Sequence, residues 1–376
     1  MVKTIVLAAG SLKGLKAITN SPSRSLLKLG DKTILEHIIE VVKGRCDRIV
    51  VVLPQGATIS REYGEYNLVV VNQDTTSNNI VEAICLGFNA CNREDDTYVI
   101  IYGDIYAEKP FYVKPLINAE QGLYPSIMVT IPSVPRSTYL YLDIDMVSTK
   151  VVKVGEGSYI HAGALVLHSK ELETLCRETR NIHALLAKLV QHEGLYADVW
   201  TGVWVDIDSP WDYMLALHHY LSQLRRQILS FEANIASTAI LEGPMVVEDG
   251  AVIDHYAVIK GPAYISKNSI IGTHAFIRDN VFIGSKVTVG AYTEVKRSIL
   301  LDESYVASHC YIADSIIGEK ASIASFTVTR NIPYKSLPSE VLVTTTLDVE
   351  RLKIGAVVTK GKRIDPHSTL MPATYY

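Results

Sequence analysis

Two hydrophobic patterns divide the chain. Up to about residue 220, short apolar, β-rich runs alternate with segments whose apolar residues recur at helical spacing. Continuous apolar strands that alternate with helices predict a mostly parallel, Rossmann-like α/β sheet covered on both faces, with ligands at the carboxyl ends of its strands. The predicted strands are Thr4–Ala8, Arg48–Leu53, Leu68–Val71, Tyr98–Tyr102 and Ser126–Ile131, and the predicted helices are 33–43, 79–92 and 211–231.

After this region an aliphatic residue recurs every sixth position. Neither a helix nor a flat sheet has a six-residue period, whereas a parallel β-helix stacks such residues inside. We therefore predict an α/β unit over residues 1–230 and a hexapeptide-repeat β-helix over 231–376. The predicted interior residues are Ile235, Leu241, Val247, Ile253, Ile259, Ile265, Ile271, Ile277, Ile283, Val289, Val295 and Leu301, followed by Val306, Ile312, Ile317, Ile323, Val358, Ile364 and Leu370.

Composition narrows the classes of function. With 36 Lys+Arg against 40 Asp+Glu and a net charge of −4, the chain lacks the basic excess of a nucleic-acid or anionic-membrane binder. No apolar run reaches the roughly 18 residues of a membrane span. Five cysteines without CxxC spacing indicate neither a disulfide framework nor a zinc site, so we expect a reducing cytoplasm.

The most basic loop follows the first predicted strand. A glycine turn at a strand's carboxyl end exposes N–H groups, and four cations without an acid suit a triphosphate. An isolated charge run is more often only a solvated loop, but this one follows a buried strand. The turn is Leu7–Gly10, and the cations are Lys13, Lys16, Arg24 and Lys28.

Leu7–Gly10 (LAAG), Ser23–Leu27 and Ile34–His37 resemble the nucleotidyltransferases that join sugar 1-phosphates, or related phosphorylated alcohols, to nucleoside triphosphates. The family's arginine falls on Gly14 here, and its lysine becomes Arg24. The resemblance implies that the backbone of Leu7, Ala8, Ala9 and Gly10 cradles the triphosphate. It also implies a catalytic role for Arg24. Lys13 or Lys16 would have to take the place of the missing arginine, and we predict a catalytic role for Lys13.

Two acidic motifs extend the resemblance. Tyr102-Gly103-Asp104 ends a predicted strand, and 204–210 reads WVDIDSP. The resemblance implies that Asp104 and Asp206 bind Mg²⁺ and that Gly103 contacts the nucleotide, which fits the preference of Mg²⁺ for carboxylates and phosphate oxygens. Either aspartate alone could equally be a turn residue.

Weaker matches concern substrate recognition. Ser77 and Asn78 lie where the family contacts the nucleotide, although they could simply cap a helix. This Asn-rich segment resembles the branch that uses inositol or choline phosphates with CTP as much as the hexose branch. Glu156 and Gly163 fall where the family contacts the sugar phosphate.

The repeat resembles the left-handed β-helix of bifunctional nucleotidyltransferase/acetyltransferases. The family's acetyl-transfer histidine falls on Ser308, with His309 one position late on the opposite side of the strand, and Phe326 would crowd that site. A general base one residue out of register cannot reach its proton. We therefore expect an architectural β-helix through which copies of the chain associate.

Two hypotheses follow. The first is an Mg²⁺-dependent nucleotidyltransferase that takes an NTP and a sugar 1-phosphate and releases pyrophosphate. The second is a binding or regulatory relative with weak or no turnover. It is favoured by Gly14, Ser308 and Phe326 and by Leu12, which stands where the family has its second glycine. Acetyl transfer is a third and weaker alternative.

Overall fold

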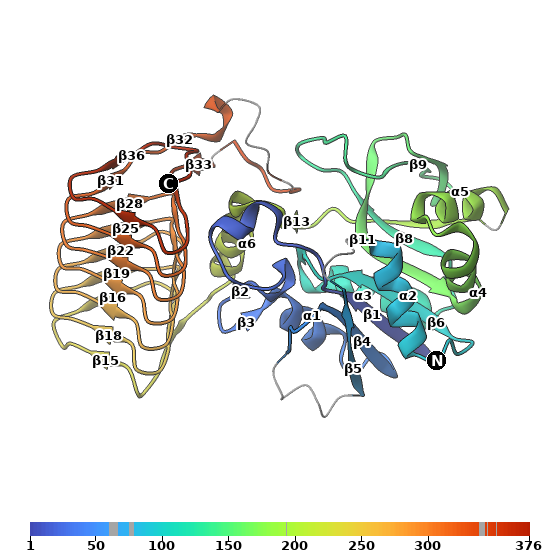
Figure 1. Cartoon of the computed structure of the whole chain (residues 1–376), viewed down its shortest axis with the longest axis horizontal. Coiled ribbons are helices and arrows are strands. Elements are labelled where there is room, and N and C mark those ends of the chain that lie inside the picture. Colours follow the sequence, from blue (N-terminus) through green and yellow to red (C-terminus); the bar gives the residue numbers. More distant parts are fainter. Residues whose placement is uncertain (60–66, 75–78, 193, 338–342, 344, 351) are drawn as a thin grey trace.

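The computed structural model describes residues 1–59, 67–74, 79–192, 194–337, 343, 345–350 and 352–376. An α/β region and a β-helix lie side by side, with helix α6 (Pro210–Ser222) between them (Figure 1). Within these ranges no helix is long and apolar enough to cross a membrane.

A nine-stranded sheet forms the centre of the α/β region, in the order β5-β4-β1-β6-β11-β8-β12-β10-β9. β11 and β10 run against the other strands, and the five predicted strands are confirmed to within two residues at each end. The strands are β1 (Val2–Leu7), β4 (Arg48–Pro54), β5 (Leu68–Gln73), β6 (Thr97–Tyr102), β8 (Ser126–Thr130), β9 (Tyr141–Asp145), β10 (Lys150–Val154), β11 (Tyr159–His168) and β12 (Tyr196–Val199).

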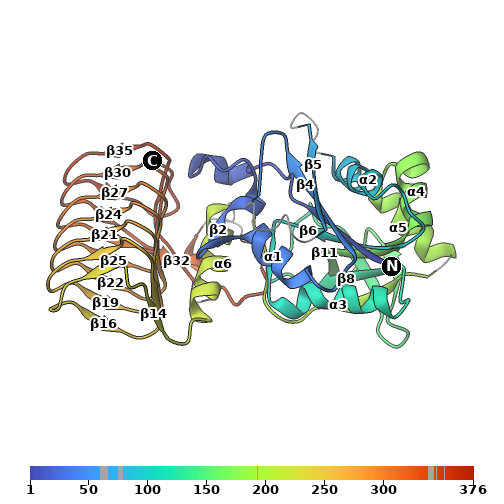
Figure 2. The ribbon, with the colours of Figure 1, turned by 90° about the horizontal axis from the view of Figure 1, so that it is seen from below.

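Helices cover both faces of this sheet, as predicted (Figure 2). One face packs on α1 and α3, and the other packs on α2, α4 and α5, each through its own apolar cluster. A capping box between Thr33 and Glu36 fixes the start of α1, and the Asn79 side chain caps α2. The helices are α1 (Ile34–Val42), α2 (Ile80–Ala90), α3 (Lys109–Glu120), α4 (Ser169–Thr174) and α5 (Ile182–His192).

The predicted helix over 211–231 is too long. α6 ends at Ser222, and Gln227–Leu229 is already the first strand, β14, of the β-helix. Its side chains are exposed, which sequence periodicity alone does not distinguish from a helix terminus.

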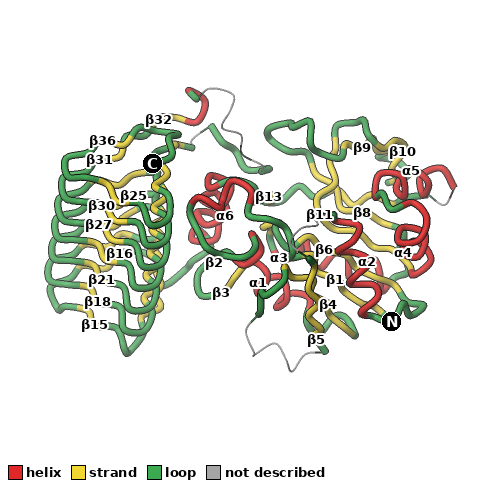
Figure 3. The backbone as a smooth tube through the Cα atoms, in the orientation of Figure 1, coloured by secondary structure: helices red, strands yellow, loops and turns green. Residues whose placement is uncertain are grey.

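Three seven-stranded parallel sheets confirm the left-handed β-helix (Figure 3). The first comprises β14 (Gln227–Leu229), β17 (Met245–Val247), β20 (Ala263–Ile265), β23 (Val281–Ile283), β26 (Ile299–Leu300), β29 (Ile316–Ile317) and β34 (Val357–Val358). The second comprises β15 (Asn234–Ile235), β18 (Val252–Ile253), β21 (Ile270–Ile271), β24 (Thr288–Val289), β27 (Tyr305–Val306), β30 (Ser322–Ile323) and β35 (Arg363–Ile364). The third comprises β16 (Ile240–Glu242), β19 (Val258–Lys260), β22 (Phe276–Arg278), β25 (Glu294–Lys296), β28 (Tyr311–Ala313), β31 (Val328–Thr329) and β36 (Thr369–Leu370).

The six-residue pattern finds the interior of the β-helix with one error. Predicted rungs such as Ile253 and Ile271 pair across one coil and are buried inside. At the end of the regular run, however, Leu300 rather than Leu301 lies inside. Leu300 pairs with Ile283, only 17 positions earlier, so this coil is one residue short and Leu301 turns toward the α/β region.

The two regions share one apolar cluster. Tyr264 and Phe282, which point outward from the first β-helix sheet, pack in the same cluster as Tyr213 and Leu217 of α6, and all four are buried. Buried aromatic rings contribute much of the stabilisation in such contacts. The β-helix is therefore joined to the α/β region by a continuous core.

One segment leaves the β-helix and returns. Between the coil that ends in β31 and the final coil from β34 to β36, the chain runs out through a two-stranded ribbon, β32 (Ile332–Pro333) and β33 (Lys353–Ile354). Figure 1 shows this segment reaching toward β13 (Trp204–Asp206) of the α/β region. β13 itself pairs with β7 (Ile105–Ala107), which follows β6.

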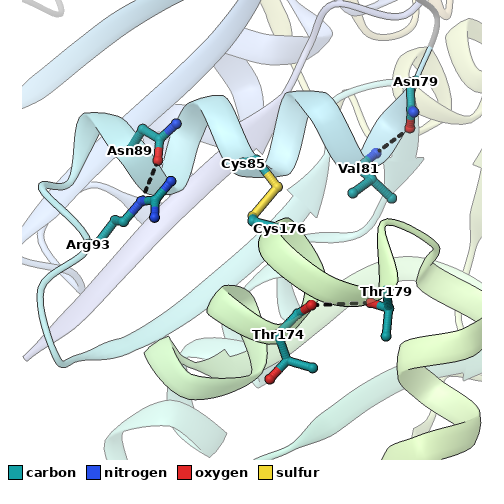
Figure 4. Close-up of a disulfide and its surroundings, with 8 residues drawn as sticks. All are labelled: Asn79, Val81, Cys85, Asn89, Arg93, Thr174, Cys176 and Thr179. Atoms are coloured by element: carbon teal, nitrogen blue, oxygen red, sulfur yellow. Dashed lines mark hydrogen bonds between the residues drawn. A yellow bond between two sulfur atoms is a disulfide. The ribbon is translucent and has the colours of Figure 1, made fainter.

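One disulfide contradicts the expectation drawn from the cysteine spacing. Cys85 of α2 is bonded to Cys176, 91 positions later, in the π-helical turn Leu175–Thr179 (Figure 4). A pair so far apart in sequence leaves no spacing signal. The disulfide also removes the cysteine argument for a reducing compartment, so the cytoplasmic location stays a prediction.

We predict that reduction with dithiothreitol lowers the free energy of unfolding by about 2–4 kcal/mol, because this bond closes a long loop in the unfolded chain. Urea unfolding of the oxidised and reduced chain measures the difference. Cys85→Ser is the control and should not respond to dithiothreitol. An unchanged urea midpoint on reduction of the wild type would contradict the prediction.

Candidate active site

The carboxyl ends of β1 and β6 open into a cleft with two chambers. One chamber, of about 270 Å³, extends toward Gln73 and Asn79. The other, of about 280 Å³, extends toward His161 and Trp204. Both chambers are lined by Lys13, Arg24, Ile80, Tyr102 and Asp104. The two chambers therefore meet beside these shared side chains.

The first chamber contains the predicted turn. Leu7, Ala9 and Gly10 line it, whereas Ala8 is buried and its carbonyl accepts a hydrogen bond from the Ser23 hydroxyl. In the part of the chain that the structure describes, no protein acceptor is bonded to the backbone N–H of Ala9 or Gly10. Such free N–H groups at the end of a parallel strand suit an anionic ligand.

Arg24 lies among three carboxylates. Its guanidinium is 2.5 Å from Asp104 and 3.8 Å from Asp206, and it is also hydrogen-bonded to Asp208. The Arg24 side chain is buried, which by itself lowers its pKa, but the negative charges of Asp104, Asp208 and Asp206 raise it. Arg24 is therefore a permanent cation at the junction of the chambers.

Only two of the four predicted cations line the cleft. Lys13 joins Arg24 there, with its ammonium 2.8 Å from the Asp208 carboxylate. Lys16 is exposed on a short 3₁₀ helix, and Lys28 forms an ion pair of 2.8 Å with Asp302 of the β-helix. The positive field is therefore narrower than the basic loop suggested.

The two predicted metal ligands are brought together by β7 and β13. Asp104 directly precedes β7, Asp206 ends β13, and the N–H of Ile207 donates to the Asp104 carbonyl at 3.1 Å. Removal from water raises the pKa of Asp206 well above its usual value, and the charges of Asp104 and Asp208 raise it further. These carboxylates repel one another, so an added cation would stabilise them.

The donor set fits a hard divalent ion. Three carboxylates face two cations, Arg24 and Lys13, which leaves one negative charge and an all-oxygen set of donors. Among the described residues no group of three or more His, Cys, Asp or Glu side chains forms a complete metal site. Asp104 and Asp206 could hold a divalent cation such as Mg²⁺ only together with oxygens of a ligand or of water.

The second chamber contains one of the two residues predicted to bind the sugar phosphate. Gly163 lines it with φ +94°, and a Cβ there would come within 2.8 Å of Ile105. Beside it His161 lies edge-on to Tyr102, with ring centroids 5.0 Å apart. Burial lowers the pKa of His161 to about 4, so its imidazole is neutral at pH 7.

Other predicted residues lie elsewhere. Glu156 is 71% exposed and pairs with Lys153 at 2.6 Å, outside the cleft, because the turn after β10 directs it to the surface. Gly103 packs beneath the cleft, where a Cβ would lie 2.9 Å from the Leu7 carbonyl. Ser77 and Asn78 lie outside the described residues.

Sequence reasoning gave no role to several polar residues at the site. Asp208 stands inside the quoted 204–210 motif but was given no role, although it contacts both cations. Gln73 and His183 line the two chambers, and neither had a signal in the sequence. His161 lies two positions before Gly163, so the match at Gly163 could have indicated it.

The β-helix position that resembles an acetyl-transfer site has a different structure. His309 sits at a corner with φ +61°, and its ring stacks between Tyr292 at 5.2 Å and Phe326 at 5.1 Å. The stack continues along the corner, and all its members are exposed. They are Tyr256, His274, Tyr292, His309, Phe326 and His367, and we call them the aromatic ladder.

Comparisons with known proteins agree with this organisation. The model of the MobA-like NTP transferase domain matches residues 4–192, and that of the GMPPB C-terminal domain matches residues 259–371. The bifunctional protein GlmU of Methanococcus maripaludis (strain C7) is 32% identical over 382 residues, which cover 98% of this chain and 90% of that protein.

Two more distant proteins are also similar. Probable mannose-1-phosphate guanylyltransferase 1 of Oryza sativa subsp. japonica is 25% identical over 67% of this chain and 73% of its own length. A crystal structure of a putative glucose-1-phosphate thymidylyltransferase from Bacillus anthracis is 16% identical, with a TM-score of 0.49 over 58% of this chain and 95% of that one. On the match over residues 4–192 and the 32% identity to GlmU, the chain belongs to the family of MobA-like NTP transferases.

Proposed function

We propose that the chain is an Mg²⁺-dependent nucleotidyltransferase that joins a sugar 1-phosphate, or a related alcohol phosphate, to an NTP. The products are a nucleotide-sugar and pyrophosphate. The observation that carries the proposal is the cleft of two chambers with Lys13, Arg24 and Asp104 at their junction. A transfer between two bound substrates needs cations at such a junction, where charge develops on the reacting phosphate.

The chain's own groups would act by positioning and charge. The N–H groups of Ala9 and Gly10 would bind the triphosphate, and the second chamber beside Gly163 would hold the sugar phosphate. An oxygen of the sugar phosphate attacks the α-phosphorus, and pyrophosphate leaves with the electron pair of the broken bond. Arg24 and Lys13 would neutralise the charge that develops. Mg²⁺, held by Asp104 and Asp206, would supply further positive charge on the triphosphate.

Lys13 would take the place of the family's arginine. That position is Gly14 here, and a Cβ on Gly14 would lie only 3.3 Å from the Asp208 carbonyl, so little room remains for a side chain. The neighbouring Lys13 lines both chambers and is 52% exposed, which leaves it free to turn toward a bound phosphate. A lysine supplies a point charge rather than the arginine's fork.

A binding or regulatory role without turnover is the second candidate. The observation that favours it is the pairing of Arg24 with all three carboxylates and of Lys13 with Asp208, which offsets most of the negative charge without a metal ion. In this candidate the nucleotide would bind in the first chamber and stay intact. Acetyl transfer through the β-helix is less favoured, because His309 is held in the aromatic ladder.

We also propose that copies of the chain associate with one another through the β-helix. The aromatic ladder forms a continuous row of exposed rings along the corner between the second and third sheets, and these two sheets also expose Tyr305 and Val328, respectively. Exposed apolar surface of this kind marks interaction sites. A second copy of the chain, with the same periodic surface, would be its partner.

Asp104→Asn should reduce pyrophosphate release by about 10²-fold or more, because it removes one metal carboxylate from the reacting phosphates. The assay offers each NTP with Mg²⁺ against sugar, inositol and choline phosphates. Asp249→Asn, an exposed β-helix carboxylate, is the matched control and should keep wild-type activity. Nucleotide binding by the wild type without pyrophosphate release from any pair would establish the second candidate instead.

Lys13→Met should lower kcat by about 10²-fold, since it removes one of two cations at the junction. Lys16→Met removes an exposed lysine three positions away and should leave kcat unchanged. Steady-state kinetics of both variants with the same substrate pair make the comparison. Equal kcat values for Lys13→Met and the wild type would exclude Lys13 from catalysis.

The mass in solution should be a multiple of the 41.5 kDa chain, and Tyr292→Glu should lower it by placing a charge in the aromatic ladder. Multi-angle light scattering gives both masses. Gln191→Glu, on the exposed side of α5, makes the same charge change away from the ladder and should leave the mass unchanged. A wild-type mass of one chain would contradict association.

A further inference from the structure

A short piece of the segment that leaves the β-helix lies against the candidate site. We call its described residues, 343 and 345–350, the strap. Val343 and Thr345 are fully buried, and Val343 belongs to the apolar cluster that also contains Trp204 and Val205. The first part of the strap is therefore packed into the α/β region, whereas Asp348 and Glu350 are exposed.

The strap is joined to β13 by an isolated β-bridge and by hydrogen bonds. Thr345 bridges Val205 in antiparallel fashion, and the Thr346 N–H donates to the Trp204 carbonyl at 2.9 Å. The Thr346 hydroxyl accepts from the Trp204 N–H at 2.9 Å and lies 2.9 Å from the Gly202 carbonyl, to which it donates. One threonine side chain thus satisfies the backbone on both sides of the bend that leads into β13.

The strap is also hydrogen-bonded to the loop that forms one wall of the second chamber. The Ser133 N–H donates to the Thr345 carbonyl at 2.8 Å, and the Ser133 hydroxyl donates to the Leu347 carbonyl at 3.0 Å. Residues 138–140, a few positions later in the same loop, line the second chamber. The strap therefore bridges this loop and β13, which both contribute to the chamber that would take the sugar phosphate.

Trp204 connects the strap to the candidate site, because it is hydrogen-bonded to both. Its backbone is bonded to the strap, and its indole N–H donates to the Ala162 carbonyl at 2.8 Å, beside Gly163. Trp204 is 2% exposed, and Asp206 follows two residues later at the end of the same strand. A shift of Trp204 would therefore move the chamber wall and the metal carboxylate together.

We propose that Thr346 is a positioning residue of the α/β site, supplied by the β-helix segment, and that it holds β13 where Asp206 and the sugar-phosphate chamber require it. The effect of Thr346 on catalysis rests on the proposed function, whereas its effect on the position of β13 does not. Catalytic groups tolerate displacements of only about 0.5 Å, so the hydrogen bonds that hold them are as necessary as the groups themselves.

The experiment compares Thr346→Val with Thr346→Ser in the full chain. Valine has the shape of threonine but leaves the Trp204 N–H without an acceptor, whereas serine keeps the hydroxyl. We expect valine to raise the KM for the sugar phosphate and to lower kcat, each about fivefold or more, with the KM for the NTP changed by less than about twofold. Serine should restore wild-type values, and Thr288→Val, on the second β-helix sheet, is the matched control.

Amide hydrogen exchange gives a readout that does not need turnover. In Thr346→Val the N–H of Ile207, which joins β13 to the Asp104 carbonyl, should exchange at least about tenfold faster, although it does not touch Thr346. If the wild type has no turnover, the proposed function is wrong. The exchange rate of the Ile207 N–H still tests whether Thr346 positions β13. Wild-type exchange at Ile207 in Thr346→Val, or wild-type kinetics in an active protein, would overturn it. If Thr346→Val does not fold, Ser133→Ala removes only the bond to Leu347 and takes its place with the same two readouts.

Discussion

The buried guanidinium of Arg24 is the interaction on which the site depends. It joins three carboxylates that arrive from different elements: Asp104 after β6, Asp206 at the end of β13, and Asp208 just before α6. Buried charges are costly unless they are paired and hydrogen-bonded, and loss of one partner leaves the others uncompensated. Arg24 therefore fixes the relative positions of β6, β13 and α6, and with them the junction of the two chambers.

The β-helix supports this junction from two directions. From Asp208 the chain passes directly into α6, whose capping box of Ser209 and Asp212 begins the helix that packs on Phe282 of the β-helix. From the other direction Thr346 of the strap is bonded to Trp204, two residues before Asp206. The β-helix thus contacts both ends of the acidic motif, and in the proposed function it would help to hold the carboxylates in place.

Local patterns in the sequence predicted most of the fold. Strand and helix periodicities and the six-residue rungs depend on near neighbours, so β1, α1 and the interior residue Ile253 were predicted correctly. Leu301 was misplaced because one coil is a residue short, and only stacking on the neighbouring coils shows this. The bond between Cys85 and Cys176 joins positions 91 residues apart and leaves no local pattern.

The site residues also fall into those that a local sequence pattern indicates and those that depend on long-range contacts. Asp104 follows β6 of the main sheet, whereas Asp206 ends β13, which pairs with β7 outside that sheet, so only the two acidic motifs indicated that they would meet. Glu156 was placed in the site from a weak match and lies at the surface instead. The proposed role of Thr346 depends on its hydrogen bond to Trp204, 142 positions away, and no sequence motif indicates this pair. Long-range contacts therefore account for the parts of the site that the sequence left open.

Phosphorus NMR of the full chain with Mg²⁺, an NTP and a sugar 1-phosphate tests the central claim most directly, because it follows the fate of every phosphate at once. A junction of two chambers with shared cations predicts that the β- and γ-phosphates leave together as pyrophosphate. It also predicts that the α-phosphorus and the sugar phosphate form one new diphosphate. Unchanged resonances from all substrate pairs, or the appearance of orthophosphate in place of pyrophosphate and the new diphosphate, would contradict a nucleotidyl transfer site.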